Sequence, residues 1–284
     1  MPDVAYVNGE FVALEKACLP INDRAFYFAD AVYEACTTFG GEVFLLDEHL
    51  DRLERSLAGI RIDYPVDRRF FAEMVREGIR RSGYAETLIY IQISRGAALR
   101  EKDFPKEARP GLMATFREKP PTNLRARERG ITVLLVPDDR WGHCNYKTTM
   151  LLPNVLAHQK AHDCGKDDAI FYDGERNVVY EATSANVFIV RDGRVETPAE
   201  GPKILSGTTR RYVLDLAKRS GYVIREREIP VDEFLSADEV FLTGTTTEVL
   251  GVVAIDDRRI GDGRPGPVTR DLTRLFEESV GIRH

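Results

Sequence analysis

The sequence predicts an α/β protein built from two domains. Its 284 residues are 43% hydrophobic, which is enough material for more than one core. Short β-rich runs and amphipathic helix patterns are mixed in both halves, without a regular βαβ alternation or an internal repeat. A polar segment with two successive prolines separates the halves, because proline continues neither a helix nor a central strand. We expect the ligand site in the cleft between the two domains.

The first half is assigned to a smaller α/β domain, residues 1–118. Residues 87–94 and 111–116 are strand-like runs. Leucine and isoleucine recur at spacings of four and three from residue 46 to residue 60, which predicts an amphipathic helix. A second helix pattern covers residues 70–79.

Residues 119–130 are predicted to be the interdomain linker, and residues 131–284 the larger C-terminal domain. In this second half, strand-like runs are again separated by helical patterns. The predicted strands are 131–136, 169–172, 187–190 and 240–243, and the predicted helices are 154–164, 208–220 and 268–280.

Bulk properties exclude some classes of function. Forty basic residues against forty-six acidic ones give a net charge of -6, which offers no broad attraction for nucleic acid or an anionic membrane. The N-terminus lacks a signal pattern, and no apolar run approaches the roughly 20 residues of a membrane span. The four cysteines form no CxxC pair, so we expect reduced thiols and a cytoplasmic protein.

Lys147 is a candidate reactive amine. It lies among aromatic, hydroxyl and aliphatic residues in Tyr146–Pro153 rather than among charged ones. Partial burial would favour the uncharged amine, which is the form that attacks a carbonyl carbon. The alternative is an ordinary lysine whose stem covers apolar surface while its ammonium stays in water.

Two hydroxyl-rich turns are candidates for an anion site. Residues 205–210 open a predicted helix, where backbone amides point outward at the positive end of the helix dipole. Residues 243–247 follow a predicted strand and place threonines around a glycine. Taken singly, each is also an ordinary helix cap or turn.

Glu181 precedes an apolar strand, where it could pair with a protonated heterocyclic nitrogen or simply face solvent.

Metal and nucleotide sites are not predicted. His158 and His162 have the i, i+4 spacing of metal ligands, but the residues between them lack the glutamate of a zinc protease helix. We therefore place both on a solvated helix face. The sequence contains no GxGxxG, GxxxxGK[ST] or GxSxG motif.

Six segments in a fixed order carry a resemblance to a known family. They are Asp23–Glu34, Glu48–Leu53, Lys147 with Leu152–Ala157, Glu181–Phe188, Leu205–Arg210 and Asp238–Thr243. In these segments the chain is similar to the fold type IV aminotransferases, which use pyridoxal 5′-phosphate (PLP), and most similar to the D-amino acid aminotransferases among them. The resemblance runs nearly end to end. It implies an α/β (α+β) fold of two domains with the active site in the interdomain cleft.

The same resemblance implies a role for each candidate residue. Lys147 would hold PLP as a Schiff base, and Glu181 would pair with the pyridine nitrogen. A carboxylate that keeps this nitrogen protonated lets the ring accept electron density from the substrate carbanion. The freed lysine amine would transfer the proton, which implies ping-pong kinetics. The cofactor phosphate would be bound by Arg52, Thr208, Thr209 and Thr245.

The expected substrates are D-amino acids. In the D-specific enzymes a tyrosine, an arginine and a histidine two residues after that arginine hold the substrate carboxylate. The matching residues here are Tyr33, Arg100 and Lys102. Lysine replaces the histidine and keeps positive charge, but it lacks the fixed plane of an imidazole. We expect transamination between D-alanine or D-glutamate and pyruvate or 2-oxoglutarate.

Other activities of the same fold remain as alternatives. Branched-chain L-aminotransferases, (R)-amine transaminases and aminodeoxychorismate lyase share the lysine, the glutamate and the phosphate turns, and Tyr33 with Arg100 favours the D-specific group. A non-enzymatic alternative is a protein that binds another phosphorylated ligand through the hydroxyl-rich turns. The resemblance also implies a homodimer in which the partner supplies residues near each site.

Overall fold

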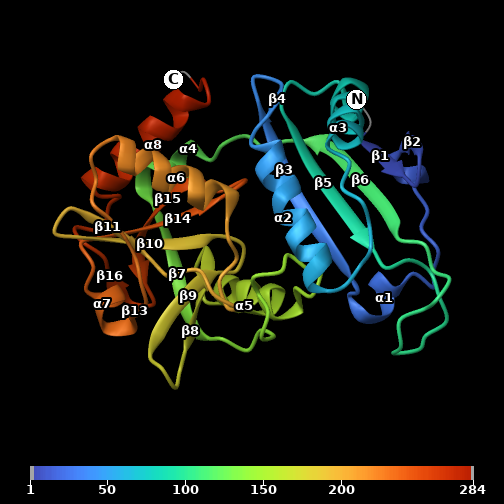
Figure 1. Cartoon of the computed structure of the whole chain (residues 1–284). Helices are drawn as coiled ribbons and strands as arrows, with labels where there is room; N and C mark the ends of the chain where they lie inside the picture. Colours follow the sequence, from blue (N-terminus) through green and yellow to red (C-terminus); the bar gives the residue numbers. More distant parts are fainter. Residues whose placement is uncertain (1–2, 283–284) are drawn as a thin grey trace. The chain divides into compact units, whose positions relative to one another are not determined.

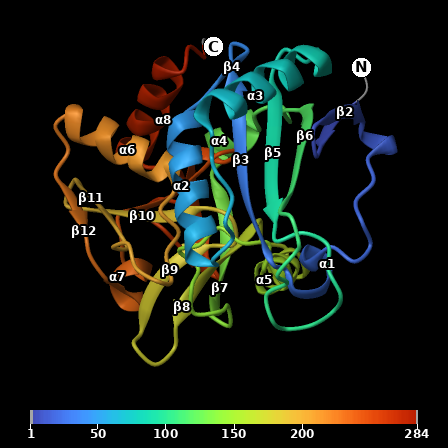
Figure 2. The same cartoon turned by 45° about the vertical axis from the view of Figure 1, so that its right-hand side comes forward.

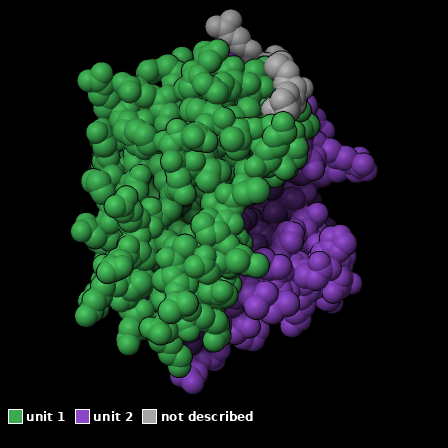
Figure 3. Space-filling model, turned by 90° about the vertical axis from the view of Figure 1, so that its right-hand side faces the viewer, with its two compact units in different colours: residues 1–121, 146–150 green, residues 122–145, 151–284 purple. Residues whose placement is uncertain are grey.

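The computed structural model describes residues 3–282, which divide into two compact units. The first unit consists of Met1–Pro121 with Tyr146–Met150, and the second of Thr122–Asn145 with Leu151–His284 (Figure 3). The change from one unit to the other follows the double proline of the sequence. Inside the segment 119–130 that we expected to be a linker, the second unit already begins with a short helix, α4 (Leu124–Arg129).

The first unit is an antiparallel sheet with two long helices on one face (Figures 1 and 2). The strand order is β2-β1-β6-β5-β3-β4; α2 contacts β3, and α3 contacts β1, β5 and β6. A short 3-10 turn, Leu14–Lys16, follows β2. The elements are β1 (Val4–Val7), β2 (Glu10–Ala13), α1 (Arg24–Phe28), β3 (Ala31–Phe39), β4 (Glu42–Val43), α2 (Leu46–Gly59), α3 (Arg68–Ser82), β5 (Thr87–Ser94) and β6 (Gly111–Glu118).

Hydrophobic periodicity explains this arrangement. Alternate residues of β5 are buried, so Ile89, Ile91 and Ile93 reach the core that α2 and α3 cover. The leucines of α2 recur on one helix face and lie in the same core. Both strands and both helices expected in this half are therefore confirmed.

The second unit is a mixed sheet flanked by helices. The described residues form a sheet of order β12-β11-β10-β14-β15-β7-β8-β9-β13, with β16 added to β15. The strands and helices expected from the sequence in this half are all present, with ends that shift by at most two residues. The remaining elements are β7 (Ile131–Pro137), α5 (Leu152–Asp163), β8 (Asp168–Asp173), β9 (Val178–Ala182), β10 (Asn186–Arg191), β11 (Arg194–Thr197), α6 (Thr208–Arg219), β12 (Ile224–Glu226), β13 (Ile229–Pro230), α7 (Val231–Leu235), β14 (Glu239–Gly244), β15 (Glu248–Ile255), β16 (Arg258–Arg259) and α8 (Pro267–Ser279).

One extra pairing closes part of this sheet on itself. β10 pairs with β14 along its length, and Asn186 at its start also pairs with Glu181 at the end of β9. The path β10-β14-β15-β7-β8-β9 thus returns to β10. Glu181 and Asn186 lie at the point where the ring of strands closes.

The segment Tyr146–Met150 is bound to the first unit by its backbone. The amide of Tyr33 donates to the carbonyl of Lys147 (2.9 Å), and the amide of Thr149 donates to the carbonyl of Ala31 (3.1 Å). Thr148 also forms a bridge with Val32. Lys147 therefore belongs with the first unit, whereas the sequence analysis placed it in the C-terminal domain. Chain order suggested that assignment, but the strand β3 that accepts this segment is more than 100 residues away.

Among residues 3–282, no helix combines the length and the apolar character needed to cross a lipid bilayer.

A glycine at the end of α2 makes room for the residue before Lys147. A Cβ atom on Gly59 would lie only 2.3 Å from the ring of Tyr146. We predict that Gly59→Ala destabilises the protein by about 1–3 kcal/mol, because the ring or the helix must move. Thermal and urea unfolding of the variant measure this. Gly174→Ala is the control, since nothing lies within 4 Å of its Cβ position. Equal stability of the two variants would contradict the packing argument.

Candidate active site

The amine of Lys147 lies above an aromatic ring. Its Nζ is 4.2 Å from the centroid of the Tyr33 ring, and that ring stacks on Tyr90 at 5.3 Å. The backbone amide of Lys147 donates to Ser56 Oγ (3.0 Å) on α2. Backbone contacts with β3 and α2 therefore fix the start of the side chain, and the tyrosine ring supports its end.

A buried cluster of three ionisable residues lies in the same unit. Arg52 on α2 makes a bidentate pair with Glu34 on β3, with Nε and Nη2 donating to the two carboxylate oxygens at 2.8 and 2.7 Å. His49 Nδ1 is 2.7 Å from Glu34 Oε2. All three are almost completely buried. The two hydrogen bonds fix the orientation of the Arg52 guanidinium, which the sequence resemblance linked to the cofactor phosphate.

The charges of this cluster determine how Glu34 titrates. Burial raises the pKa of Glu34, but the charge and hydrogen bonds of Arg52, together with His49, outweigh burial and lower it to about 2. Burial lowers the pKa of His49, although the carboxylate of Glu34 opposes this effect. Glu34 is therefore ionised at neutral pH and balances the buried guanidinium.

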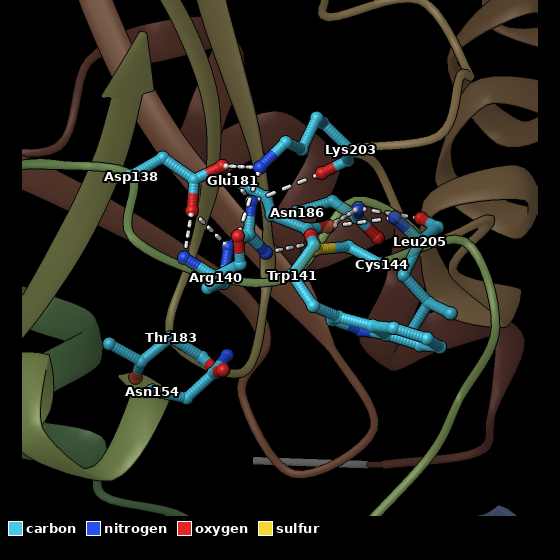
Figure 4. Close-up of polar contacts among 10 residues, drawn as sticks. All are labelled: Asp138, Arg140, Trp141, Cys144, Asn154, Glu181, Thr183, Asn186, Lys203 and Leu205. Carbon is cyan, nitrogen blue, oxygen red and sulfur yellow. Dashed lines mark hydrogen bonds and ion pairs between the residues drawn. The ribbon is translucent and has the colours of Figure 1, made fainter. Parts of the chain in front are cut away.

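In the second unit, Glu181 is a buried carboxylate with donors on both oxygens (Figure 4). Arg140 Nη1 donates to Oε1 at 2.6 Å. Oε2 accepts from Asn186 Nδ2 (3.1 Å) and from the backbone amide of Leu205 (3.0 Å). Asn186 Nδ2 also donates to the Leu205 carbonyl at 2.9 Å. These contacts hold Glu181 as a buried, oriented acceptor, rather than the solvated strand-end glutamate that was the alternative.

Arg140 is itself fixed by the residues around it. Its Nε donates to Asp138 (2.9 Å), its Nη2 to the carbonyl of Lys203 (3.1 Å), and its guanidinium lies over the ring of Phe171 at 4.4 Å. Lys203 Nζ completes the network with Asp138 at 3.1 Å (Figure 4). Burial lowers the pKa of Arg140, but Glu181 and Asp138 outweigh it and raise the pKa. Sequence analysis missed Arg140, because the local sequence around it gives no sign of partners about 40 residues away.

The two hydroxyl-rich turns lie next to this carboxylate in the second unit. Thr208 and Thr209 are buried in the first turn of α6, whose N-cap is Gly207. A Cβ on Gly207 would lie 2.0 Å from Asn186 Oδ1, so only glycine lets the helix start approach Asn186. Thr245 is in the turn between β14 and β15, and β14 pairs with Asn186 through Thr243. Both turns therefore lie beside Asn186, which is one of the donors to Glu181.

The residues expected to bind the substrate carboxylate are found in two places. Tyr33 is on β3, beneath the amine of Lys147. Arg100 and Lys102 are exposed in the loop between β5 and β6, where Arg100 lies 5.5 Å from the centre of the Phe28 ring. His158 and His162 are exposed on α5, as expected for a solvated face. Among residues 3–282, no group of three or more His, Cys, Asp or Glu side chains could hold a metal ion.

Comparison with known proteins identifies the family. Residues 31–255 match the family described as "Amino-transferase class IV". The chain belongs to the class IV aminotransferases. The D-alanine aminotransferase of Listeria monocytogenes serotype 1/2a (strain 10403S) is 33% identical over 279 residues, which covers 96% of this chain and 95% of that protein. The D-alanine aminotransferase of Bacillus licheniformis is 34% identical over 275 residues, with coverage of 96% and 95%.

Solved structures of class IV aminotransferases share the fold. A branched-chain amino acid aminotransferase from T.th., solved with pyridoxamine 5′-phosphate, has a TM-score of 0.91 and 28% identity, and the match covers 100% of this chain and 96% of that one. The branched-chain enzyme of Escherichia coli has a TM-score of 0.90 and 25% identity, with coverage of 100% and 96%. The expected family, the two-domain α/β fold type IV architecture and PLP as the cofactor are confirmed. Amino acids and 2-oxo acids are the substrates of this class.

The donor chemistry of this class IV aminotransferase fits PLP. The cofactor carries an aldehyde, a basic ring nitrogen and a phosphate dianion, which require an amine, an acceptor carboxylate and several hydrogen-bond donors. Lys147 provides an amine, and Glu181 provides a carboxylate whose oxygens are already oriented. The start of α6 provides backbone amides and two buried threonines, and Gly207 leaves the space that a Cβ would fill.

The pair of Glu34 and Arg52 predicts a pH-dependent stability difference. The pKa of Glu34 falls from 4.5 to about 2 on folding, so its stabilisation is fully present above pH 4.5 and is lost as the pH falls through about 2. We predict that Glu34→Gln costs about 3–5 kcal/mol at neutral pH, because Arg52 loses its buried partner. The difference from the parent protein should shrink on acidification through this window, as measured by urea unfolding at a series of pH values.

Glu77→Gln is the matched control for this measurement. Glu77 pairs with Arg80 and Arg81 on the surface of α3, and these hydrogen bonds lower its pKa to about 2 as well. Solvent screens exposed pairs, so its replacement should change stability far less. If both variants lost the same free energy of unfolding, burial would not make the Glu34–Arg52 pair more stabilising than an exposed one.

Proposed function

We propose that this class IV aminotransferase transfers the amino group of a D-amino acid, of the D-alanine or D-glutamate type, to a 2-oxo acid such as pyruvate or 2-oxoglutarate. The observation that carries the proposal is the position of the Lys147 amine above the ring of Tyr33. It brings the expected catalytic amine next to the tyrosine expected to bind the substrate carboxylate. Relatives named D-alanine aminotransferase, 33–34% identical over nearly the whole chain, support the same substrate class.

We propose that one PLP molecule is bound by the residues that the sequence singled out. Lys147 would hold it at the aldehyde carbon, and the oriented carboxylate of Glu181 would accept from the protonated ring nitrogen. When bound, PLP supplies a ring that accepts the electron pair left on the substrate α-carbon. The donors for its phosphate would be Arg52, Thr208, Thr209 and Thr245.

The protein's own residues would then move the proton. Once the substrate amine has replaced it, the amine of Lys147 is free to take the proton from the substrate α-carbon. The Tyr33 ring under its Nζ restricts where that amine points. Arg140 fixes one oxygen of Glu181, so the carboxylate would stay oriented toward a protonated ring nitrogen.

The substrate carboxylate would be held by Tyr33, Arg100 and Lys102. Arginine offers a planar fork of donors that matches a carboxylate, so Arg100 is its main partner in this proposal. Lys102 adds a flexible point charge in place of the usual histidine.

A second candidate activity is transamination of branched-chain L-amino acids. Its support is the likeness to branched-chain aminotransferases among solved structures, with a TM-score of 0.91. Identity to the two structures described above is 28% and 25%, against 33–34% to the D-alanine aminotransferases. The D-specific activity is therefore our first proposal.

We also propose that the enzyme works as a homodimer in the cytoplasm. Large apolar side chains are exposed in both units, including Ile21, Phe26 and Leu99 in the first and Leu152 and Val155 in the second. Exposed apolar surface of this kind is typical of protein interfaces. The cytoplasmic assignment rests on the four free cysteines, which form no disulfide framework.

Replacement of the amine tests the mechanism. We predict that Lys147→Ala abolishes multiple turnover, because neither a covalent hold on PLP nor a proton carrier remains. In the parent enzyme, borohydride should fix the cofactor covalently at Lys147, as measured by peptide mass spectrometry. Lys160→Ala, which changes an exposed lysine of α5, should retain both properties. Appreciable steady-state turnover by Lys147→Ala would refute the assignment.

A substrate panel tests the proposed specificity. The holoenzyme is mixed with single D- and L-amino acids, and the change in the cofactor's absorption is followed without a 2-oxo acid. D-alanine and D-glutamate should convert the cofactor, and pyruvate or 2-oxoglutarate should then restore it, as ping-pong kinetics requires. Reaction with L-leucine or L-valine alone would favour the branched-chain activity, and reaction with (R)-phenylethylamine would indicate a pocket that does not require a carboxylate.

A further inference from the structure

The loop that carries Arg100 and Lys102 has no helix or strand of its own. It spans residues 95–110, between β5 and β6. The two strands pair in register as far as Ser94 and Gly111, so the sheet fixes only the ends of the loop. Structureless loops of this length are uncommon in compact domains and are often functional. Backbone bonds from residues 22–24 hold the loop as far as Ala98, so the side chains that order the part beyond it decide where Arg100 and Lys102 point.

Arg24 on α1 binds this loop on both sides of Lys102. Its Nη1 donates to the carbonyl of Glu101 at 2.6 Å and to the carbonyl of Asp103 at 3.3 Å. Its backbone amide donates to the carbonyl of Gly96 at 3.0 Å. The guanidinium is buried, with 4% of its side chain exposed. A buried cation with two loop carbonyls as acceptors holds the backbone around Lys102 more firmly than water would.

Asp30 in turn fixes Arg24 and the base of the loop. Its Oδ2 accepts from Arg24 Nε at 2.8 Å and from Arg95 Nε at 2.8 Å. Its Oδ1 accepts from Arg95 Nη2 at 2.9 Å. Arg95 also donates to the carbonyls of Ile60 and Arg61, after the end of α2. One carboxylate thus links α1, the start of the loop and α2.

The ring of Phe28 brings Arg100 to the same place. The guanidinium of Arg24 lies 4.7 Å from the centre of this ring, and that of Arg100 lies 5.5 Å from it. Both are within the range of a cation–π contact. Arg24 therefore fixes the backbone beside Lys102 and shares the aromatic support of Arg100.

We propose that Arg24, held by Asp30 and Phe28, is a positioning residue that sets the direction of Arg100 and Lys102 for binding the substrate carboxylate. This inference rests on the proposed function of those two residues. It applies equally whether the loop serves the site of its own chain or that of a second copy. Lys102 depends most on such support, because a flexible ammonium has no preferred plane and takes its direction from the backbone.

The network also predicts that Arg24 can be replaced without loss of the fold. If Arg24 is replaced, Asp30 keeps two hydrogen bonds from Arg95. Its carboxylate therefore remains paired, which avoids the main cost of breaking a buried ion pair. The loop carbonyls of Glu101 and Asp103 belong to exposed residues and can accept from water instead.

Single-turnover titrations of the holoenzyme test the proposal, with D-alanine or the amino acid that reacts best in the substrate panel. Arg24→Lys keeps the charge but cannot bridge Asp30 and the loop carbonyls with a planar fork. We expect the dissociation constant to rise about 10-fold or more, as for a lost hydrogen bond to a charged group, while the rate at saturation stays within about 2-fold. Arg68→Lys, at a surface ion pair of α3, is the matched control and should change neither quantity.

A double-mutant cycle separates positioning from a general structural effect. Arg24→Lys should have little effect on the dissociation constant in a chain that already carries Arg100→Ala and Lys102→Ala, because nothing is left to position. Phe28→Leu, which removes the ring but keeps apolar bulk, should raise the dissociation constant in the parent chain and not in that background.

The outcomes distinguish an error in the proposed carboxylate site from an error in the role of Arg24. If Arg100→Ala leaves the dissociation constant unchanged, the proposed carboxylate site is wrong and the inference falls with it. If Arg100→Ala raises the constant but Arg24→Lys does not, only the inference is overturned. It is also overturned if the effect of Arg24→Lys persists in the Arg100→Ala and Lys102→Ala background.

Discussion

The buried carboxylate of Glu181 is the interaction on which the arrangement of the second unit depends. An ionised carboxylate out of water costs several kcal/mol unless donors replace its hydration. Here they come from separate parts of the chain: the guanidinium of Arg140, the side chain of Asn186 and the amide of Leu205. Because Asn186 also pairs with Glu181 across the strands, the donor set and the closure of the sheet depend on each other. The start of α6 then lies against Asn186, since Gly207 has no Cβ to keep it away.

The first unit uses the same physical device, a buried carboxylate paired with an arginine, to join a strand to a helix. Glu34 on β3 and Arg52 on α2 form a bidentate pair that fixes both elements in rotation as well as in distance. The neighbouring end of β3 receives the backbone of Lys147, and α2 contributes Ser56 to the same residue. The pair therefore stabilises the two elements that hold Lys147. Apolar residues could pack β3 on α2, but they would not specify the rotation that brings Tyr33 under Lys147.

Local pattern predicted the strands and helices whose side chains alternate or recur, such as 87–94 and 208–220, because burial on one face leaves that trace in the sequence. It did not reveal β3, where Glu34, Thr37 and Thr38 are buried among apolar residues and blur the alternation. Their partners come from distant segments, as Arg52 does for Glu34. Arg140 was missed for the same reason, because its partners Glu181 and Phe171 are distant from it in the sequence. The roles of Lys147 and Glu181 came from resemblance, because composition and spacing alone left ordinary alternatives open for both.

In the proposed carboxylate site, lysine at position 102 in place of the histidine of the D-specific enzymes makes recognition depend on how the loop is ordered. An imidazole donates in one plane, so its ring orientation alone selects the direction of a bound carboxylate. A lysine ammonium can rotate, and its four-carbon stem must lose that freedom when a carboxylate binds. The loss of conformational entropy on binding is smaller if the backbone beside the lysine is already ordered. Arg24 meets this condition, because it binds the carbonyls on both sides of Lys102 while Asp30 holds it from below. A lysine at this position is thus compatible with carboxylate binding as long as the loop, rather than the residue, supplies the direction.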